Sequence, residues 1–397
     1  MIMEIFKKGE LFCGPGGLAF GAQNASFTDE TGKEYKVEHT WANDIDLAAC
    51  RTFAHNICGV DEEKVDECVC SSEDELDITN GKSVLCKDVK QIDITKLPPI
   101  DAFTFGFPCN DFSIVGEQKG FEGNYGPLYT YGVKVLNTHN PKWFLAENVG
   151  GLQSANGGEA FKQIIRDLSN SGNYGGYELT PHLYKFEQYG VPQMRHRIII
   201  VGIRKDIVKE QGIQFRVPAP ITPTKEEYKT AKWALEVGKE EIAVTLNGNF
   251  YNNEVTKHSS TVIERLKEIP AGGNAWCECI PQHLRLNVKG AKLSNIYKRL
   301  NPDKPAYTVT GSGGGGTHMY HYSEDRALTS RERARLQSFP DNYKFLGSKE
   351  EVRKQIGMAV PVEGARIIIE AILKTFAHKD YDYVESKWNI EELRDTK

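Results

Sequence analysis

Short runs of apolar residues alternate with helix-like patterns over roughly the first 205 residues of the chain. Apolar runs of this length, bounded by turn residues, indicate β-strands, and their alternation with helices is typical of a doubly wound α/β sheet. The expected strands span residues 10–13, 38–43, 100–106, 143–147 and 197–203. Open α/β sheets bind ligands at the carboxyl ends of their strands, so the residues that follow these strands are expected to share one crevice.

A different pattern follows residue 205, where prolines interrupt a stretch of weak periodicity that ends in a glycine-rich run at 311–316. This pattern predicts a separate, irregular unit with few strands. Helical order returns at Thr329–Glu332, where a capping box predicts a helix that extends to about Ser338. Pro361 can occupy the first turn of a final helix, whose apolar face would carry Ala365, Ile368, Ile369 and Ile372.

The length of 397 residues exceeds what a single hydrophobic core usually supports, so two domains are expected. We expect residues 1–205 and 357–397 to form the domain that contains the sheet. Residues 206–325 would form the smaller, irregular domain, and residues 326–356 would join the two.

Charge is distributed unevenly along the chain. The formal net charge of −5 at pH 7 argues against a general polyanion-binding protein. Residues 1–202 carry a net charge of −10, whereas 203–330 carry +4 and 331–397 carry +1. Much of the acid lies in 61–77, which is typical of a solvated surface insertion. The basic middle segment could face phosphates, although ordinary surface scatter would give the same balance.

Composition excludes several classes of protein. A content of 40% hydrophobic and 26% charged residues is ordinary for a globular protein and excludes disordered, collagen-like and coiled-coil chains. No apolar run reaches the roughly 18–20 residues of a membrane span, and the first residues lack the apolar core of a secretory signal. Nine cysteines, an odd number scattered over a long chain, indicate reduced thiols. Their spacings do not suit a metal, so no metal site is expected.

A glycine-rich turn, Phe12–Gly17, follows the first apolar run and precedes a helical pattern. Glycines there permit a tight turn and a close approach of the main chain to a ligand. The dinucleotide-binding fingerprint requires a third glycine where Ala19 stands, so a ligand without a pyrophosphate fits better. S-adenosylmethionine needs main-chain donors and two acids, for which Asp44 and Asp88 are candidates. A plain glycine turn remains the simpler interpretation of this motif alone.

Three further motifs carry reactive side chains. Cys109 lies just past one expected strand, and Glu147 ends another. Gln193–Arg197 leads into a third, where the alternation of side chains along an extended segment would place Arg195 and Arg197 on one face. A buried structural cysteine would explain Cys109 alone. A cysteine nucleophile, a carboxylic acid and two arginines, however, form a coherent set for one reaction.

With these motifs, the chain resembles the DNA (cytosine-5) methyltransferases over nearly its whole length and in the same motif order. The resemblance rests on Phe12–Gly17, Gly106–Ser113, Glu147–Val149, Gln193–Arg197, Arg331–Asp341 and Gln355–Pro361. It implies the doubly wound sheet of S-adenosylmethionine-dependent methyltransferases, with residues 206–325 as a target-recognition domain. Two residues depart from the family pattern, since Asn110 replaces a glutamine and Met358 replaces an asparagine.

The resemblance implies a covalent mechanism. C5 of cytosine is too weak a nucleophile to accept a methyl group from a sulfonium until a thiolate adds to C6. Cys109 is the implied nucleophile, and Glu147 would hold or protonate N3 of the base, which requires a partly buried carboxyl. Arg197 would bond O2 of the base, and Arg195 would support the developing charge. Because C6 is inaccessible in a stacked duplex, the cytosine must be flipped out. Asn148 is expected to order the loop of the nucleophile rather than to react.

The resemblance also implies a pocket for S-adenosylmethionine, in which Asp44 binds the ribose, Asp88 the adenine amine, and Phe12 lies over the adenine. The full set of implied cofactor-binding residues is Phe12, Gly14, Pro15, Gly17, Asp44, Ile45, Asp88, Pro108, Leu128, Ala359 and Val360. The implied DNA-binding residues are Ser113, Gln193, Thr308, Gly313 and Gly314. The loop from Ser113 to Tyr125 would close over the flipped base.

Three alternative functions are tRNA methylation, DNA binding by a catalytically silent relative, and nicotinamide oxidoreduction. The RNA-modifying branch carries a Cys-Phe-Thr run in its recognition segment, and this chain has none there. The intact set of reactive residues argues against a silent relative, and the glycine spacing argues against an oxidoreductase. We therefore expect a monomeric modification enzyme of a bacterium or phage that acts on double-stranded DNA. It is expected to lie in the cytoplasm, associated with the nucleoid, and to make no contact with a membrane. A cognate restriction endonuclease that acts on the same site is the expected partner.

Overall fold

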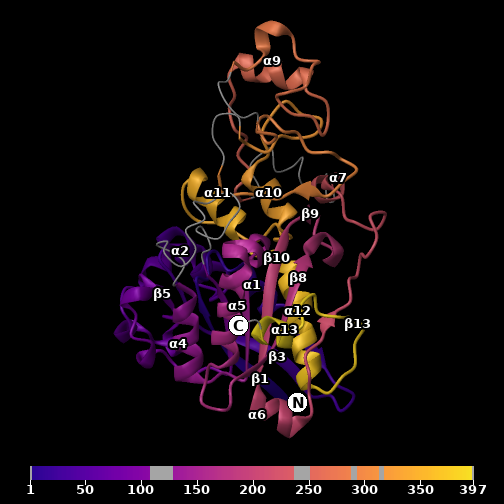
Figure 1. Cartoon of the computed structure of the whole chain (residues 1–397). Helices are drawn as coiled ribbons and strands as arrows, with labels where there is room; N and C mark the ends of the chain where they lie inside the picture. Colours follow the sequence, from indigo (N-terminus) through magenta and orange to yellow (C-terminus); the bar gives the residue numbers. More distant parts are fainter. Residues whose placement is uncertain (1, 108–127, 237–250, 288–292, 313–316, 396–397) are drawn as a thin grey trace. The chain divides into compact units, whose positions relative to one another are not determined.

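The computed structural model describes residues 2–107, 128–236, 251–287, 293–312 and 317–395. The chain forms two compact units (Figure 1). Unit 1 comprises Met1–Lys185, His196–Pro220 and Gly364–Lys397, and unit 2 comprises Phe186–Arg195 and Ile221–Glu363. None of the helices in the described ranges combines the length and apolar character that a membrane crossing requires.

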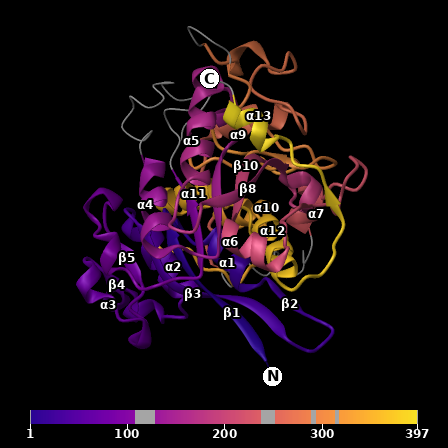
Figure 2. The same cartoon turned by 60° about the horizontal axis from the view of Figure 1, so that its bottom comes forward.

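Unit 1 is built on a nine-stranded sheet in the order β4-β5-β3-β1-β6-β7-β10-β8, with β2 paired to β3. Strands β1 to β5 of this sheet are labelled in Figure 2. The neighbours from β4 to β7 are parallel, whereas β10 is antiparallel to β7 and β8. The strands are β1 (Met3–Leu11), β2 (Ser26–Thr28), β3 (Glu34–Asp44), β4 (Val69–Cys70), β5 (Val84–Cys86), β6 (Ala102–Gly106), β7 (Trp143–Val149), β8 (Tyr177–Lys185) and β10 (His196–Arg204). The strand order reverses at β1, because the chain first proceeds to β3 and later returns on the other side of β1 at β6. The expected doubly wound α/β fold is confirmed.

Helices connect these strands and close the unit at its C-terminus. They are α1 (Gly17–Gln23), α2 (Leu47–Asn56), α3 (Val65–Cys68), α4 (Tyr129–His139), α5 (Glu159–Ser169), α6 (Lys205–Gln211), α12 (Val362–Phe376) and α13 (Ile390–Asp395). A short pair, β11 (Val217–Pro218) and β13 (Tyr383–Val384), lies outside the large sheet. The final long helix, α12, begins at Val362, directly after Pro361, which was expected in its first turn. All four apolar residues expected on its face are buried.

The first strand lies earlier in the chain than residues 10–13, where it was expected. Two charged side chains inside it, Lys8 and Glu10, are buried and interrupt the apolar pattern that would have revealed it. They form an ion pair with each other, and Lys8 Nζ lies 3.4 Å from Thr104 Oγ1 on β6. Such charges are tolerated in a core when they are paired. The pattern also missed β5, which has three residues, and β8, which Pro181 interrupts at the sheet edge.

Unit 2 carries little regular structure in its described residues, as the weak periodicity predicts. Its elements are η9 (Phe186–Tyr189), β9 (Gln193–Met194), α7 (Ala231–Glu236), α9 (Ser260–Glu268), η10 (Gln282–Leu284), β12 (Ala306–Tyr307), α10 (Ser330–Leu336) and α11 (Lys349–Met358). The predicted capping box is confirmed, since Thr329 and Glu332 exchange hydrogen bonds at the start of α10.

The boundaries of the two units differ from the expected domains in four places. Residues 206–220 belong to unit 1, and residues 357–363 belong to unit 2. Residues 186–195 belong to unit 2, because β9 pairs with β12 and not with the large sheet. The segment 326–356, expected to join two domains, lies entirely in unit 2. Helices α10 and α11 therefore belong to the irregular unit.

The cysteines correct one expectation. Cys277 and Cys279 form a disulfide, with their Cα atoms 5.2 Å apart, so the expectation of reduced thiols fails for this pair. The two cysteines lie in the segment after α9 and are separated by one residue. The free cysteines of the described residues are Cys13, Cys50, Cys58, Cys68, Cys70 and Cys86.

Candidate active site

The glycine-rich turn joins the carboxyl end of β1 to α1. Phe12 and Gly14 have positive φ values of 55° and 52°. Cys13 N donates to Asn43 O at 3.0 Å, and Gly14 N donates to Asp44 Oδ2 at 2.8 Å. Glycine adopts this conformation without strain, whereas Phe12 does so at a cost that is characteristic of ligand-binding turns. The turn is therefore held against the carboxyl end of β3.

Asp44 ends β3, and main-chain donors bind both oxygens of its carboxylate. Besides Gly14 N, Asp46 N donates to Asp44 Oδ1 at 2.9 Å. Burial raises the pKa of Asp44, and these hydrogen bonds oppose the shift. Ile45, the next residue, leaves 69% of its surface exposed. An acid and an exposed apolar surface thus adjoin, which suits a ligand that carries hydroxyl groups and a flat ring.

The other expected cofactor residues of unit 1 follow strands β1, β5 and β6. Pro15 and Gly17 are buried at the start of α1, and Leu128 is buried at the start of α4. Asp88 follows β5 and caps the short helix η4 (Val89–Gln91), where its Oδ1 accepts a hydrogen bond from Lys90 N at 3.0 Å. All four lie in segments that leave the carboxyl ends of parallel strands.

Asn43 is a positioning residue that the sequence analysis missed. Its Nδ2 donates to Leu85 O at 2.9 Å and to Lys87 O at 2.8 Å, which joins the ends of β3 and β5. The side chain is buried, and its main-chain oxygen also accepts the hydrogen bond from the glycine turn. The signal in the sequence was the Asn43-Asp44 pair at the end of a strand, where the asparagine as well as the aspartate has a side chain that can hold the turn.

Glu147 and Arg197 form an ion pair at the same edge of the sheet. Arg197 Nε lies 2.9 Å from Glu147 Oε1, and the two side chains are 13% and 12% exposed. Strand register explains the pairing, because Arg197 opposes Val149 and Ile199 opposes Glu147, which places the pair on one face. Burial lowers the pKa of Arg197, and the carboxylate opposes this shift. On β6, a Cβ at Gly106 would lie 3.2 Å from Glu147 Oε2, so glycine leaves room for the carboxylate.

Asn148 holds the segment that leads to the expected nucleophile. This buried side chain donates from Nδ2 to Phe107 O at 3.2 Å and accepts at Oδ1 from Val149 N at 2.8 Å. The contact agrees with the loop-ordering role expected for Asn148. Pro108, Cys109, Asn110 and the loop from Ser113 to Tyr125 lie outside the described residues.

Replacing Asn148 by alanine should lower the free energy of unfolding by about 1–3 kcal/mol, because the carbonyl of Phe107 would be buried without its donor. Single-turnover methyl transfer should slow, while the affinity for S-adenosylmethionine should stay near the wild-type value. Chemical denaturation and rapid-quench kinetics measure these quantities. Asn173→Ala, at an exposed position, is the matched control. Unchanged stability and transfer in Asn148→Ala would contradict this role.

Arg195 lies in unit 2 and is 1% exposed. Its Nη1 donates to Val309 O at 3.1 Å and its Nη2 to Met358 O at 3.5 Å. The prediction that Arg195 and Arg197 share one face assumed a single extended segment, whereas β9 and β10 belong to different sheets. Within unit 2, Arg195 joins two segments of main chain.

Gln193 corrects an expected DNA contact. The side chain is fully buried, and its amide is used inside unit 2. Nε2 donates to Leu336 O at 3.1 Å and to Gln337 Oε1 at 2.9 Å, while Oε1 accepts from Val309 N at 2.8 Å. A direct contact with DNA would break all three bonds, so Gln193 acts as a structural residue in the described conformation.

The remaining expected residues of unit 2 lie in two segments. Thr308 donates its hydroxyl to Met194 O at 2.7 Å at a partly exposed position, and Gly313 and Gly314 lie outside the described residues. Ala359 and Val360 directly follow α11 and are buried. Met358, which departs from the family pattern, is 62% exposed.

Comparisons with known proteins agree on one family. A family model described as C-5 cytosine-specific DNA methylase matches residues 6–374. The chain is 58% identical to the type II methyltransferase M.BbvI of Brevibacillus brevis over 393 residues, which cover 98% of this chain and 96% of the relative. It is 38% identical to the type II methyltransferase M.NgoFVII of Neisseria gonorrhoeae over 382 residues, or 94% and 88% of the two chains.

Solved structures agree on the fold. One of them is the crystal structure of a DNA modification methyltransferase encoded within a prophage of E. coli. The match covers 94% of this chain and 99% of that chain, with a TM-score of 0.65 and 21% sequence identity. The fold and the family are those of S-adenosylmethionine-dependent methyltransferases. The matched range contains the glycine-rich turn, Asp44 and the Glu147–Arg197 pair. This chain belongs to the C-5 cytosine-specific DNA methylase family.

Proposed function

We propose that this chain is the modification enzyme of a type II restriction–modification system and methylates C5 of a flipped cytosine in a short duplex site. The observation that carries the catalytic part of the proposal is the Glu147–Arg197 ion pair, next to the segment that Asn148 holds before Cys109. The restriction–modification role rests on the names of relatives that match over nearly their whole length.

In the proposed reaction the thiolate of Cys109 adds to C6 of the cytosine and makes C5 nucleophilic. Electrons move toward N3, where Glu147 holds or donates a proton. Arg197, already paired with Glu147, would bond O2 of the base and help to orient the carboxyl. Arg195, whose guanidinium donates to main-chain carbonyls of unit 2, would support the developing charge or the adduct. After C5 is methylated, loss of its proton to a base and release of the thiolate restore the aromatic ring.

The residues at the carboxyl edge of the sheet fit S-adenosylmethionine. Its chemical contribution, when bound, is a methyl group on an electrophilic sulfonium. The glycine turn offers main-chain donors, the carboxylate of Asp44 suits ribose hydroxyls, and the exposed side chain of Ile45 suits a flat ring. Asp88 would take the adenine amine. Phe12, Gly14, Pro15, Gly17, Pro108, Leu128, Ala359 and Val360 complete the proposed set.

The binding of S-adenosylmethionine should depend on pH through Asp44. Because burial raises the pKa of Asp44, its carboxylate protonates at a higher pH than an ordinary aspartate, so affinity should fall as the pH drops through that raised value. Asp44→Asn should bind at least about tenfold more weakly at pH 7.5, as for one lost charge-assisted hydrogen bond, and its affinity should vary less with pH. Calorimetric titration from pH 8 down to the lowest pH at which the protein stays folded measures both effects, with Asp93→Asn as control. A wild-type affinity that changes with pH no more than that of Asp44→Asn would refute this role.

Transfer of tritium from methyl-labelled S-adenosylmethionine tests the proposed substrate. Duplex DNA of mixed sequence should become labelled, whereas tRNA should not. Labelled tRNA with unlabelled DNA would favour the RNA-modifying alternative, and no label in either would favour a catalytically silent relative. Bisulfite sequencing of DNA from a host that expresses the gene would then identify the site, and digestion with restriction enzymes would show whether the methyl group protects it.

The proposal assigns target recognition to residues 206–325 and a monomeric state to the enzyme. The mildly basic charge of residues 203–330 supports contact with DNA. We further propose that the enzyme acts in the cytoplasm at the nucleoid, where the DNA and a cognate endonuclease would be found. Light scattering of the purified chain with and without duplex DNA tests the monomeric state.

A further inference from the structure

Arg333, on α10 of unit 2, is a buried cation with almost no partners. Its side chain is fully buried, and its Nε and Nη2 have no hydrogen-bond partner within the described part of the chain. Its one hydrogen bond runs from Nη1 to Thr310 O at 3.5 Å, which is long for such a bond. A buried guanidinium normally satisfies most of its five donors, so this one can accept a further partner beyond those in the described residues.

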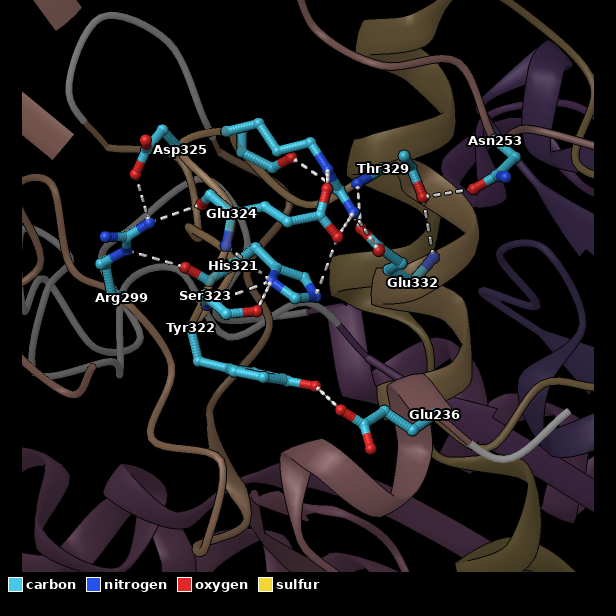
Figure 3. A network of polar contacts seen from close by, with 12 residues as sticks. Glu236, Asn253, Arg299, His321, Tyr322, Ser323, Glu324, Asp325, Thr329 and Glu332 are labelled. Atoms are coloured by element: carbon cyan, nitrogen blue, oxygen red, sulfur yellow. Dashed lines mark hydrogen bonds and ion pairs between the residues drawn. The ribbon is translucent and has the colours of Figure 1, made fainter. Parts of the chain in front are cut away.

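Three other arginines of unit 2 have more partners. Arg299, which is buried, donates to four main-chain carbonyls and to the carboxylate of Asp325, and its contacts with Glu324 and Asp325 are drawn in Figure 3. Arg331, two residues before Arg333, donates to three main-chain carbonyls. Arg326, whose side chain is 12% exposed, forms ion pairs with two carboxylates. Arg333 therefore has fewer polar partners than these three arginines.

No acid in the described ranges forms an ion pair with Arg333. Glu332 is the next residue, but its oxygens accept hydrogen bonds from Arg326 and from the main chain of Thr329 (Figure 3). Burial, and then repulsion by Arg353, lower the pKa of Arg333 to about 10, so it stays charged at neutral pH. A buried charge without a counter-ion destabilises the free protein.

The surface beside Arg333 carries groups that suit an anion. Thr310, whose carbonyl Arg333 contacts, has an exposed hydroxyl 3.3 Å from that of Ser312. Gly311 packs closely on α11, since a Cβ there would lie 3.0 Å from Lys354 Cα. Lys354 is exposed, and the side chain of Arg353 is 16% exposed and 3.7 Å from the solvated carboxylate of Glu350. Two hydroxyls and two cations thus lie on two segments that pack together at Gly311, and Arg333 contacts the first of these segments at Thr310.

We infer that these groups form a binding site for one phosphodiester of the DNA backbone, with Arg353, Lys354, Thr310 and Ser312 at the surface and Arg333 as the buried charge behind them. This inference rests on the proposed function, since it assumes that duplex DNA is the substrate. A phosphate would supply the missing counter-charge of Arg333. Contacts of this kind fix the position of a protein on the duplex and contribute affinity at every sequence.

Arg333→Met tests the inference, because the stability of the free protein should rise while its affinity for duplex DNA falls. The midpoint of thermal unfolding should rise by about 2–4 °C, since an unpaired buried charge is removed. The dissociation constant for duplex DNA should increase about tenfold, and the slope of log K against log salt should become shallower, because one positive charge near the bound phosphate is lost. Fluorescence anisotropy with two labelled duplexes of unrelated sequence, at several salt concentrations and without cofactor, measures affinity.

Controls separate a phosphate site from a structural arginine. Arg366→Met removes an equal charge from α12 and should leave DNA affinity unchanged, whereas Arg353→Gln should weaken binding to both duplexes. Arg333→Lys should retain most of the affinity. A lower unfolding midpoint in Arg333→Met, or an affinity and salt slope equal to wild type, would overturn the inference. The measurement requires no methyl transfer, so an inactive wild type would count against the proposed function alone.

Discussion

Replacement of Cys109 by alanine is expected to reduce methyl transfer by at least about a thousandfold, because loss of a nucleophile removes the covalent route altogether. DNA affinity should stay near the wild-type value, since the thiol is proposed to react with the base and not to hold the duplex. The segment before Cys109 is anchored independently, through the hydrogen bond from Asn148 to Phe107 O. The change is therefore expected to act on the chemistry.

Trapping provides the direct measurement for this variant. Duplex DNA with 5-fluorocytosine at the target site should form a complex with the wild type that withstands denaturing electrophoresis, because fluorine cannot leave C5 as a cation. Cys109→Ala should form none. Cys68→Ala, a change of the same kind at a free thiol outside the proposed catalytic set, should trap normally. Continued methyl transfer by Cys109→Ala would show that another mechanism operates.

Glu147→Gln is expected to have the second largest effect. It should lower the rate of methyl transfer by a factor of about 10²–10⁴, the usual contribution of a general acid. The glutamine keeps the size of the side chain beside Gly106 but cannot donate a proton to N3. It also leaves the nearly buried guanidinium of Arg197 without its carboxylate, so orientation of the base at O2 should suffer as well.

Single-turnover kinetics at saturating DNA and cofactor measure this loss, and thermal unfolding checks that the variant is folded. Glu178→Gln, a partly buried acid on β8, is the matched control and should retain wild-type kinetics. If Glu147→Gln transferred methyl groups at the wild-type rate, the carboxyl would have no role in activating the cytosine. A loss explained entirely by a lower unfolding midpoint would give it a structural role instead.

The carboxyl edge of the sheet could be predicted because its residues follow apolar runs. Strands near 38–43, 100–106 and 143–147 are confirmed, and strand order brings the residues behind them to one edge. The Glu147–Arg197 pair required one more fact, the antiparallel register of β7 and β10, which local patterns do not contain. Lys8 and Glu10 show the opposite case, because charged residues inside a buried strand interrupt the apolar run from which the strand would have been predicted.

Partners that are distant in the chain determine where Gln193 and Arg195 lie, which local patterns did not predict. Gln193 and Arg195 lie in a motif that suggests exposed function, yet their side chains bind main chain more than a hundred residues away, near Val309, Leu336 and Met358. A pattern read along the chain does not reveal that β9 pairs with β12. Arg333 escaped notice for the same reason, since its lack of partners becomes visible when the atoms around it are known.

The central claim is that the methyl group goes to C5 of cytosine in DNA. The most direct test expresses the chain in a host that lacks its own DNA methyltransferases, digests the genomic DNA to nucleosides and identifies them by mass spectrometry. The account predicts 5-methyl-2′-deoxycytidine with the wild type and its absence with Cys109→Ala. Methyl groups on the exocyclic nitrogen of cytosine or adenine, or unmodified DNA with a folded wild-type protein, would contradict it.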